Sequence, residues 1–259
     1  MNLLAEHLEF APCTEHNRLS SYTPHLKRLA AEHLMATCVG MELTGSPGRV
    51  NHQNAFPLVL KPRTQDAGGP RIHENPVAQI ERLALWDDAS DKLVQQNHPN
   101  IVQILGDGDL NGKADRAFGK MFGSMDVIEV NPPGAILEPP EEAGRNRMFN
   151  WLQLLNLDYR IPGVVNTDAH YNFHGSGWLR NYVKCPTDDP GKIKTMDIVH
   201  SAERGHLIMT NGPYLEVQLV AMVIQPIRGM MLKQPAAEAC CMCEFSALIG
   251  LMSTGSRYY

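Results

Sequence analysis

Apolar positions along this chain alternate between two spacings. Short apolar runs rich in β-branched residues predict strands, and apolar residues three or four apart predict helices. The predicted strands are residues 10–13, 37–43, 55–60, 101–105, 126–130, 161–165 and 207–209. The predicted helices are residues 2–9, 24–35, 76–94 with a break at Asp87-Asp88, 145–157 and 192–204. Because strands and helices alternate with short connections, the pattern favours a parallel α/β sheet or barrel over a sandwich or a bundle.

The pattern changes at two places. Residues 61–74 contain several prolines and glycines and predict an exposed excursion. Beyond Val217 the sequence is rich in Met and Cys and weakly patterned. We therefore expect one α/β domain over residues 1–217 and an extension over residues 218–259, either a partial β module or disordered.

Composition narrows the classes of protein. A hydrophobic content of 43% with 20% charged residues is ordinary for a soluble protein. The net charge of −5 gives no basic surface for nucleic acid, so an anionic small-molecule substrate would need local groups such as metal ions. No apolar run approaches the roughly 20 residues that cross a bilayer, and no basic segment precedes Leu3 and Leu4 as in a signal peptide. We expect a cytoplasmic chain, with a secreted longer parent as the alternative.

The cysteines suggest thiols more than disulfides. Cys13 and Cys38 lie in apolar segments and are expected to be buried and reduced. Cys240, Cys241 and Cys243 could form half of a zinc site, but no second Cys or His pair follows them.

Residues 166–174, Asn-Thr-Asp-Ala-His-Tyr-Asn-Phe-His, carry the strongest candidate chemistry. Asp168 and His170 follow a predicted buried strand, and ligand sites in parallel α/β folds gather at carboxyl ends of strands. Two residues apart on extended backbone, they would point to the same side. A carboxylate and an imidazole there suit a divalent cation. The alternative is a helix-capping Asp and a surface His.

Other predicted strand ends carry the same residue types. His16 follows the first strand, Glu42 lies at the end of the second with His52 shortly after, and His98 precedes a proline. Taken singly, His98 could be a turn residue and Glu42 an exposed acid. Together, imidazoles and carboxylates at equivalent places predict a shared site for zinc, iron or manganese. A rival site, the acidic stretch 107–112, resembles the start of a calcium loop but has Phe118 where that loop needs Glu.

Four short motifs occur in a defined order, and together they resemble the polymerase-and-histidinol-phosphatase (PHP) family of metallohydrolases. They are Thr14-Glu15-His16-Asn17, Gly40-Met41-Glu42, Asn97-His98-Pro99 and Asn166-Thr167-Asp168-Ala169-His170. Thr210-Asn211-Gly212-Pro213 resembles the branch that includes carbaryl hydrolase. The resemblance implies a distorted (β/α)7 barrel with two or three metal ions, and hydrolysis of phosphate esters or of ester and carbamate bonds.

The resemblance also implies roles for individual residues. Glu42 would bridge two ions, with His52 and His98 completing the shell of one. Asp168 would bind on the other side of the bridge, and His16 and His170 would share a third ion. A metal-bound hydroxide would be the nucleophile. His174 and Arg180 could contact an anionic part of the substrate, or lie on the surface.

One departure from the family pattern bears on activity. The family begins with a strand carrying His-x-His, whereas residues 2–9 here predict a helix without that motif. We therefore expect a barrel truncated at its N-terminus that holds one ion through Glu42, His52 and His98. The main hypothesis is a metal-dependent phosphoesterase. The rivals are an impaired relative that binds a metal or small anion without turnover, and a structural or interaction module.

Overall fold

The computed structural model describes residues 1–45, 51–99, 104, 119–130, 147–171, 175–214, 218–221 and 241–244. The chain divides into two compact units, Met1–Asn211 and Gly212–Tyr259. Within the second unit, β10 (Gln218–Ala221) and β11 (Cys241–Glu244) form an antiparallel pair. The calcium-like stretch 107–112 and the side chains of Cys240, Cys241 and Cys243 fall outside the described residues.

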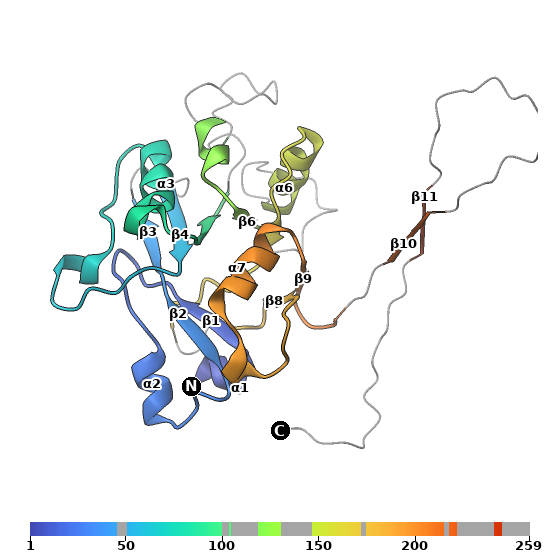
Figure 1. Ribbon diagram of the computed structural model, residues 1–259. Helices are drawn as coiled ribbons and strands as arrows, with labels where there is room; N and C mark the ends of the chain where they lie inside the picture. The colour runs from blue at the N-terminus through green and yellow to red at the C-terminus, as the bar shows by residue number, and fades with distance from the viewer. Residues whose placement is uncertain are drawn as a thin grey trace, which may run out of the picture. The chain divides into compact units, whose positions relative to one another are not determined.

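The first unit is a mixed α/β structure built on a five-stranded sheet in the order β3-β4-β5-β6-β7 (Figure 1). The five strands are β3 (Met41–Thr44), β4 (His52–Phe56), β5 (Leu93–Gln96), β6 (Val127–Glu129) and β7 (Gly163–Val164). Strands β5, β6 and β7 are parallel, but β4 is antiparallel to both of its neighbours. The expected α/β class is therefore confirmed in its coarse form, while the described strands do not close into a barrel.

Two further strand pairs accompany this sheet. Strand β1 (Phe10–Cys13) is parallel to β2 (Ala36–Val39), and β8 (Arg180–Val183) is antiparallel to β9 (Leu207–Thr210). Strand β2 leads through Gly40 directly into β3. A Cβ atom on Gly40 would lie 2.9 Å from the carbonyl oxygen of Ala55 and 3.0 Å from the Thr14 side chain. Gly40 thus lets the extension of β1 and strand β4 approach the same backbone closely.

The helices are short and cover both faces of the sheet. The α-helices are α1 (Asn2–Ala5), α2 (Thr23–Arg28), α3 (Pro76–Ala84), α4 (Trp86–Ala89), α6 (Arg147–Asn156) and α7 (Thr195–Glu203). Three 3-10 turns accompany them, η2 (Gln65–Gly68), η3 (Gly119–Gly123) and η6 (Pro190–Lys192). Helix α3 begins at Pro76 because Asn75 accepts hydrogen bonds from the backbone N–H groups of Val77 and Ala78.

The core alternates across the sheet as strand geometry requires. On β5, Val94 packs with Ile80 and Leu83 of α3, while its neighbour Leu93 packs on the other side with Val199 of α7. Ile128 and Val127 on β6 divide in the same way. Because successive strand side chains point to opposite faces, two adjacent apolar residues on one strand can pack against both buried faces of the sheet.

Several sequence predictions need correction. Residues 93–94 belong to strand β5, not to the end of a helix, because two adjacent apolar residues can serve a strand buried on both faces. The predicted strand 55–60 is displaced to His52–Phe56, and β8 was not predicted. Helices 2–9 and 24–35 are shorter than expected. The break at Asp87-Asp88 is confirmed, since both residues have positive φ. The predicted strand 101–105 falls outside the described residues except for Ile104.

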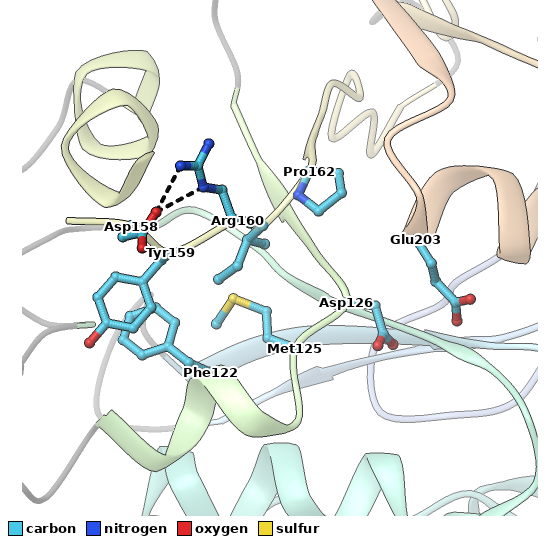
Figure 2. Close-up of a pocket in the computed structure, with 9 residues that line it drawn as sticks. Phe122, Met125, Asp126, Asp158, Tyr159, Arg160, Pro162 and Glu203 are labelled. Atoms are coloured by element: carbon cyan, nitrogen blue, oxygen red, sulfur yellow. Dashed lines mark hydrogen bonds and ion pairs between the residues drawn. The ribbon is translucent and has the colours of Figure 1, made fainter. Parts of the chain in front are cut away.

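A cavity of about 440 Å³ lies beside the start of β6 (Figure 2). Phe122 and Tyr159 stack with ring centroids 4.1 Å apart on one side of it, and Asp126 and Glu203 lie on the other. This is the amino end of β6, whereas the sequence places its candidate site at the carboxyl ends of strands. The two regions therefore lie at different edges of the sheet.

Candidate metal centre

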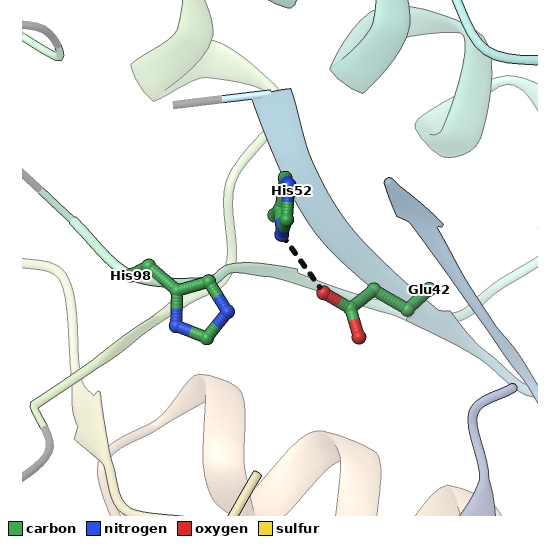
Figure 3. Close-up of side chains that lie close together, drawn as sticks. All are labelled: Glu42, His52 and His98. Carbon is green, nitrogen blue, oxygen red and sulfur yellow. Dashed lines mark ion pairs between the residues drawn. The ribbon is translucent and has the colours of Figure 1, made fainter. Parts of the chain in front are cut away.

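Glu42, His52 and His98 form a group whose ligand-type atoms all lie within 4.8 Å of one another (Figure 3). They come from three neighbouring strands or from the residues directly after them. Among the described residues, these three are the His, Cys, Asp or Glu side chains that lie close enough together to hold one metal ion. Three of the six predicted ligands are thus brought together in one place.

Strand register explains why Glu42 and His52 meet. Residue Thr44 lies opposite His52 in the antiparallel β3–β4 pair, and Glu42 lies opposite Asn54. Glu42 and Thr44 share a face of β3, so His52 is a diagonal neighbour of Glu42 on that face. The Nδ1 atom of His52 lies 3.4 Å from Oε1 of Glu42. His52 is the first residue of β4, not one that follows a strand, and it reaches the carboxyl edge of β3 because β4 is antiparallel to β3.

His98 comes from the turn after β5. The backbone N–H of Asn97 donates to the carbonyl of His52 at 3.0 Å, which extends the β4–β5 pairing to the residue before His98. His98 itself has a φ of 46°, a left-handed conformation that is uncommon for a residue with a side chain. Such strain persists where the surrounding structure fixes it, and it often accompanies functional sites.

The extension of β1 carries His16 to Glu42. The N–H of Glu42 donates to the carbonyl of Glu15, and the N–H of Asn17 donates to the carbonyl of Glu42, so that His16 and Glu42 pair as in parallel strands. The Nδ1 atom of His16 lies 3.5 Å from Oε2 of Glu42 and 2.5 Å from the Thr44 hydroxyl. His16 therefore lies on the side of Glu42 opposite to His52.

Asp168 and His170 complete the cluster from the segment after β7. The Nε2 atom of His98 lies 3.6 Å from Oδ2 of Asp168, and the Nε2 atoms of His170 and His16 are 2.9 Å apart. Asp168 has a φ of 48°, so the extended backbone assumed from sequence is not what aligns it with His170. Instead, Nδ1 of His170 hydrogen-bonds the Asp168 carbonyl at 2.7 Å, which folds the segment back on itself.

The two residues predicted to bind substrate, His174 and Arg180, are not among the residues that converge on Glu42. Arg180 donates to the carbonyl of Gly177 at 2.8 Å and to the carbonyl of Glu6 at 3.0 Å, and pairs with the Glu6 carboxylate at 3.3 Å. It therefore links β8 to the segment after α1. His174 falls outside the described residues. The substrate-binding role suggested for these two residues stays a prediction.

Glu129 and its partner Arg147 adjoin the cluster and were not predicted from the sequence. Glu129, at the end of β6, lies 2.9 Å from Nδ1 of His98 through Oε2 and pairs with Arg147 of α6 at 2.8 Å through Oε1. Its side chain is fully buried. The available signal was an acid inside the apolar run Val127-Ile128-Glu129-Val130, since a buried strand rarely carries an unpaired carboxylate.

Electrostatics hold the group together. Burial alone would raise the pKa of Glu42, but the His52 ring, the Asn97 amide and the nearby rings of His16 and His98 lower it below its ordinary value. Burial would likewise lower the pKa of His98, but the adjoining Glu129 carboxylate outweighs it and raises that pKa. The polar and charged groups around each residue therefore shift the pKa of Glu42 down and that of His98 up, toward the charged form of each.

The donor set fits a divalent cation. Oε1 of Glu42 and Nδ1 of His52 are buried and face each other at 3.4 Å, and neither atom makes an aligned hydrogen bond in the described part of the chain. Buried polar atoms without partners are costly, and a bound cation would satisfy both. One carboxylate oxygen with imidazole nitrogens suits zinc, manganese or iron better than calcium or magnesium.

No family model, curated protein or solved structure matches this chain. The fold and site define a mixed α/β protein with a candidate His/Glu metal centre. In the described residues, no helix combines the length and apolar character needed to cross a membrane.

Proposed function

We propose that this protein is a metal-dependent hydrolase of the PHP type that cleaves phosphate esters or related ester and carbamate bonds. The observation that carries the proposal is the convergence of Glu42, His52 and His98 with buried ligand atoms that make no aligned hydrogen bond among the described residues. When bound there, zinc, manganese or iron would lower the pKa of water and neutralise charge on substrate oxygens.

The chain's own residues divide the work. Glu42 and His98 are largely buried, with side chains 8% and 10% exposed, and would anchor the ion. His16, Asp168 and His170 are 45%, 38% and 43% exposed and line the solvent side of the cluster. A small substrate would approach from that side, where these three residues could bind a second ion or orient the substrate. Because the net charge is −5, an anionic substrate depends on this local site for attraction.

The proposal is tested by measuring metal content and turnover on the same preparation. Elemental analysis should find at least half an equivalent of Zn, Mn or Fe per chain. Hydrolysis of p-nitrophenyl phosphate or bis(p-nitrophenyl) phosphate should require Mn²⁺ or Zn²⁺ and stop with EDTA. Chain that holds metal but turns over neither these esters nor a p-nitrophenyl carbamate would contradict the hydrolase assignment.

One observation favours a second candidate, a PHP-like protein that binds one ion without turnover. Among the described residues a single three-residue group meets the geometry for an ion, whereas Nε2 of His16 contacts Nε2 of His170 directly. Metal binding without hydrolysis in the assay above supports this candidate. Metal content below half an equivalent would instead favour a structural module.

A further inference from the structure

Glu129 is a buried carboxylate at the carboxyl end of β6 that contacts the backbone and the ring of His98 and the side chain of Arg147. Its side chain is 0% exposed. Oε2 accepts a hydrogen bond from the backbone N–H of His98 at 2.5 Å and also lies 2.9 Å from Nδ1 of the same ring. Oε1 accepts from Arg147 at 2.8 Å. The carboxylate therefore holds the His98 backbone and faces its ring at once.

The pairing with Arg147 is costly to bury, so stability alone is a weak reason for it. Removing two charges from water costs several kcal/mol per ion, and well-packed apolar residues often stabilise a fold as well or better. The carboxylate stays compensated because the Arg147 guanidinium, 16% exposed, lies against its other oxygen. Because the Glu129–Arg147 pair is buried beside the Glu42–His52–His98 group, a role in that group is a better explanation for it than stability.

The two nitrogens of His98 face different surroundings. Nδ1 is buried 2.9 Å from Oε2 of Glu129 and makes no aligned hydrogen bond within the described residues, whereas Nε2 lies 3.6 Å from Oδ2 of Asp168. Figure 3 shows the ring with one nitrogen turned toward His52 and Glu42 and the other turned away. A neutral imidazole carries one proton, and a carboxylate beside Nδ1 favours the tautomer with the proton there. The lone pair of Nε2 then faces the group formed with Glu42 and His52.

We propose that Glu129, supported by Arg147, is a positioning residue that fixes the ring orientation and tautomer of His98 and thereby sets the cation affinity of the Glu42–His52–His98 group. The inference rests on the proposed metal site and names a residue that controls it. A carboxylate beside the other nitrogen of a ligand histidine orients the ring and makes it a better donor. The left-handed backbone of His98, held by the same oxygen, is part of this arrangement.

The test compares Glu129→Gln with the wild type by titration of metal-free protein with Zn²⁺ or Mn²⁺. The variant should bind about 10- to 100-fold more weakly, the range found for outer-shell partners of metal ligands. The matched control is Asp126→Asn, which changes an acid just before the same strand and far from His98 along it. Its cation affinity should equal that of the wild type. Equal affinities in all three proteins would overturn the inference.

Glu129→Gln leaves Arg147 without its partner, so a loss of stability could obscure the result. The double variant Glu129→Gln/Arg147→Gln removes both charges together and should unfold at a higher temperature than the single variant. It should nevertheless keep the weakened cation affinity. If the double variant binds Zn²⁺ as tightly as the wild type, the charge of Glu129 does not position His98.

A second readout needs no metal. Nitrogen-15 NMR of histidine-labelled protein in EDTA, at a pH where His98 is neutral, should show its proton on Nδ1 in the wild type and a mixture of tautomers in Glu129→Gln. Unchanged tautomers would overturn the positioning role, whatever the metal content. A wild type that binds no cation, but whose tautomer shifts in the variant, would overturn the proposed function while supporting the control of His98 by Glu129.

Discussion

The two ends of β6 carry acids in opposite surroundings. At the carboxyl end, Glu129 faces the ring of His98 and the guanidinium of Arg147. At the amino end, Asp126 shares a cavity wall with Glu203, and the pKa of each is raised by burial first and then by neighbouring acids including Asp91. At the carboxyl end unlike charges are in direct contact, whereas at the amino end neighbouring acids affect the pKa values of Asp126 and Glu203 more than Lys92 and Arg204 do.

A cavity and raised carboxylate pKa values therefore occur at the end of β6 that lacks the mixed ligands of a metal site. The cavity of about 440 Å³ lies at the acidic end, yet its carboxylates have no imidazole among the lining residues. At the other end, carboxylates and imidazoles approach one another with unsatisfied buried atoms. The mixture of ligand types, and not the size of the hollow, is what distinguishes the candidate metal centre.

The largest expected effect comes from removing the carboxylate of Glu42 from the candidate metal centre. Glu42→Ala should weaken Zn²⁺ or Mn²⁺ binding by more than about 100-fold, because it removes a direct ligand where loss of an outer-shell partner already costs 10- to 100-fold. Calorimetric titration measures this. Glu15→Ala, which removes an exposed carboxylate two residues from Cys13 and beside His16, should bind as the wild type does. Equal losses in both variants would point to a general charge effect.

A large effect on stability is expected at the acidic end. The Lys92 amine, in a residue only 5% exposed, donates to the carbonyls of Trp86 at 2.8 Å, Ala84 at 3.2 Å and Ser90. Lys92→Met should lower the free energy of unfolding by about 1–3 kcal/mol, because buried acceptors lose their donor. Urea unfolding at neutral pH measures this loss. Lys192→Met, which changes a lysine 75% exposed, should alter it by less than about 1 kcal/mol.

A moderate effect is expected on the solvent side of the metal centre. His170→Ala should lower metal content or weaken affinity by about tenfold, a change within the range for residues that support a metal shell. Elemental analysis after gel filtration measures it. His33→Ala, an exposed histidine outside the cluster, should leave metal content unchanged. Equal retention in both variants would remove His170 from the site.

The smallest effect concerns the pH dependence of stability. Because the pKa of Glu203 is raised above 4.5, the folded chain holds this proton more tightly than the unfolded chain does. The free energy of unfolding should therefore fall as pH rises from 4.5 through the raised pKa. Glu203→Gln removes this penalty and should stabilise the protein at neutral pH by roughly 0.2–1 kcal/mol, with little change in acid. Urea unfolding across this pH range measures the difference, and a variant less stable at neutral pH would contradict it.

The sequence predicted which ligand-type residues lie close together better than it predicted the directions of the strands that carry them. The ligand-type residues at His16, Glu42, His98 and Asp168 follow apolar runs that are strands or lie beside strands, so their convergence was foreseeable. The direction of β4 was not, because apolar periodicity carries no information on whether neighbours run parallel or antiparallel. Residues 93–94 were assigned to a helix because two adjacent apolar residues suit both a helix and a strand buried on two faces.

Glu129 was missed for a related reason. An acid within an apolar strand becomes informative only when its partners are known, and both come from distant parts of the chain. The left-handed backbones of His98 and Asp168 have only a weak signature in residue type, since His and Asp adopt this conformation more often than most residues but far less often than glycine. Local pattern thus predicts elements, while tertiary pairing decides which side chains meet.

The passage of β2 into β3 through Gly40 has a mechanical consequence. One extended segment, from Ala36 to Thr44, belongs first to the pair with β1 and then to the five-stranded sheet. Glu42 therefore lies on a continuous backbone segment that pairs with β1 and its extension on one side and with β4 on the other. A substitution that weakens the pairing of β1 with β2 would therefore let Glu42 shift, and would affect the candidate metal centre without changing any ligand.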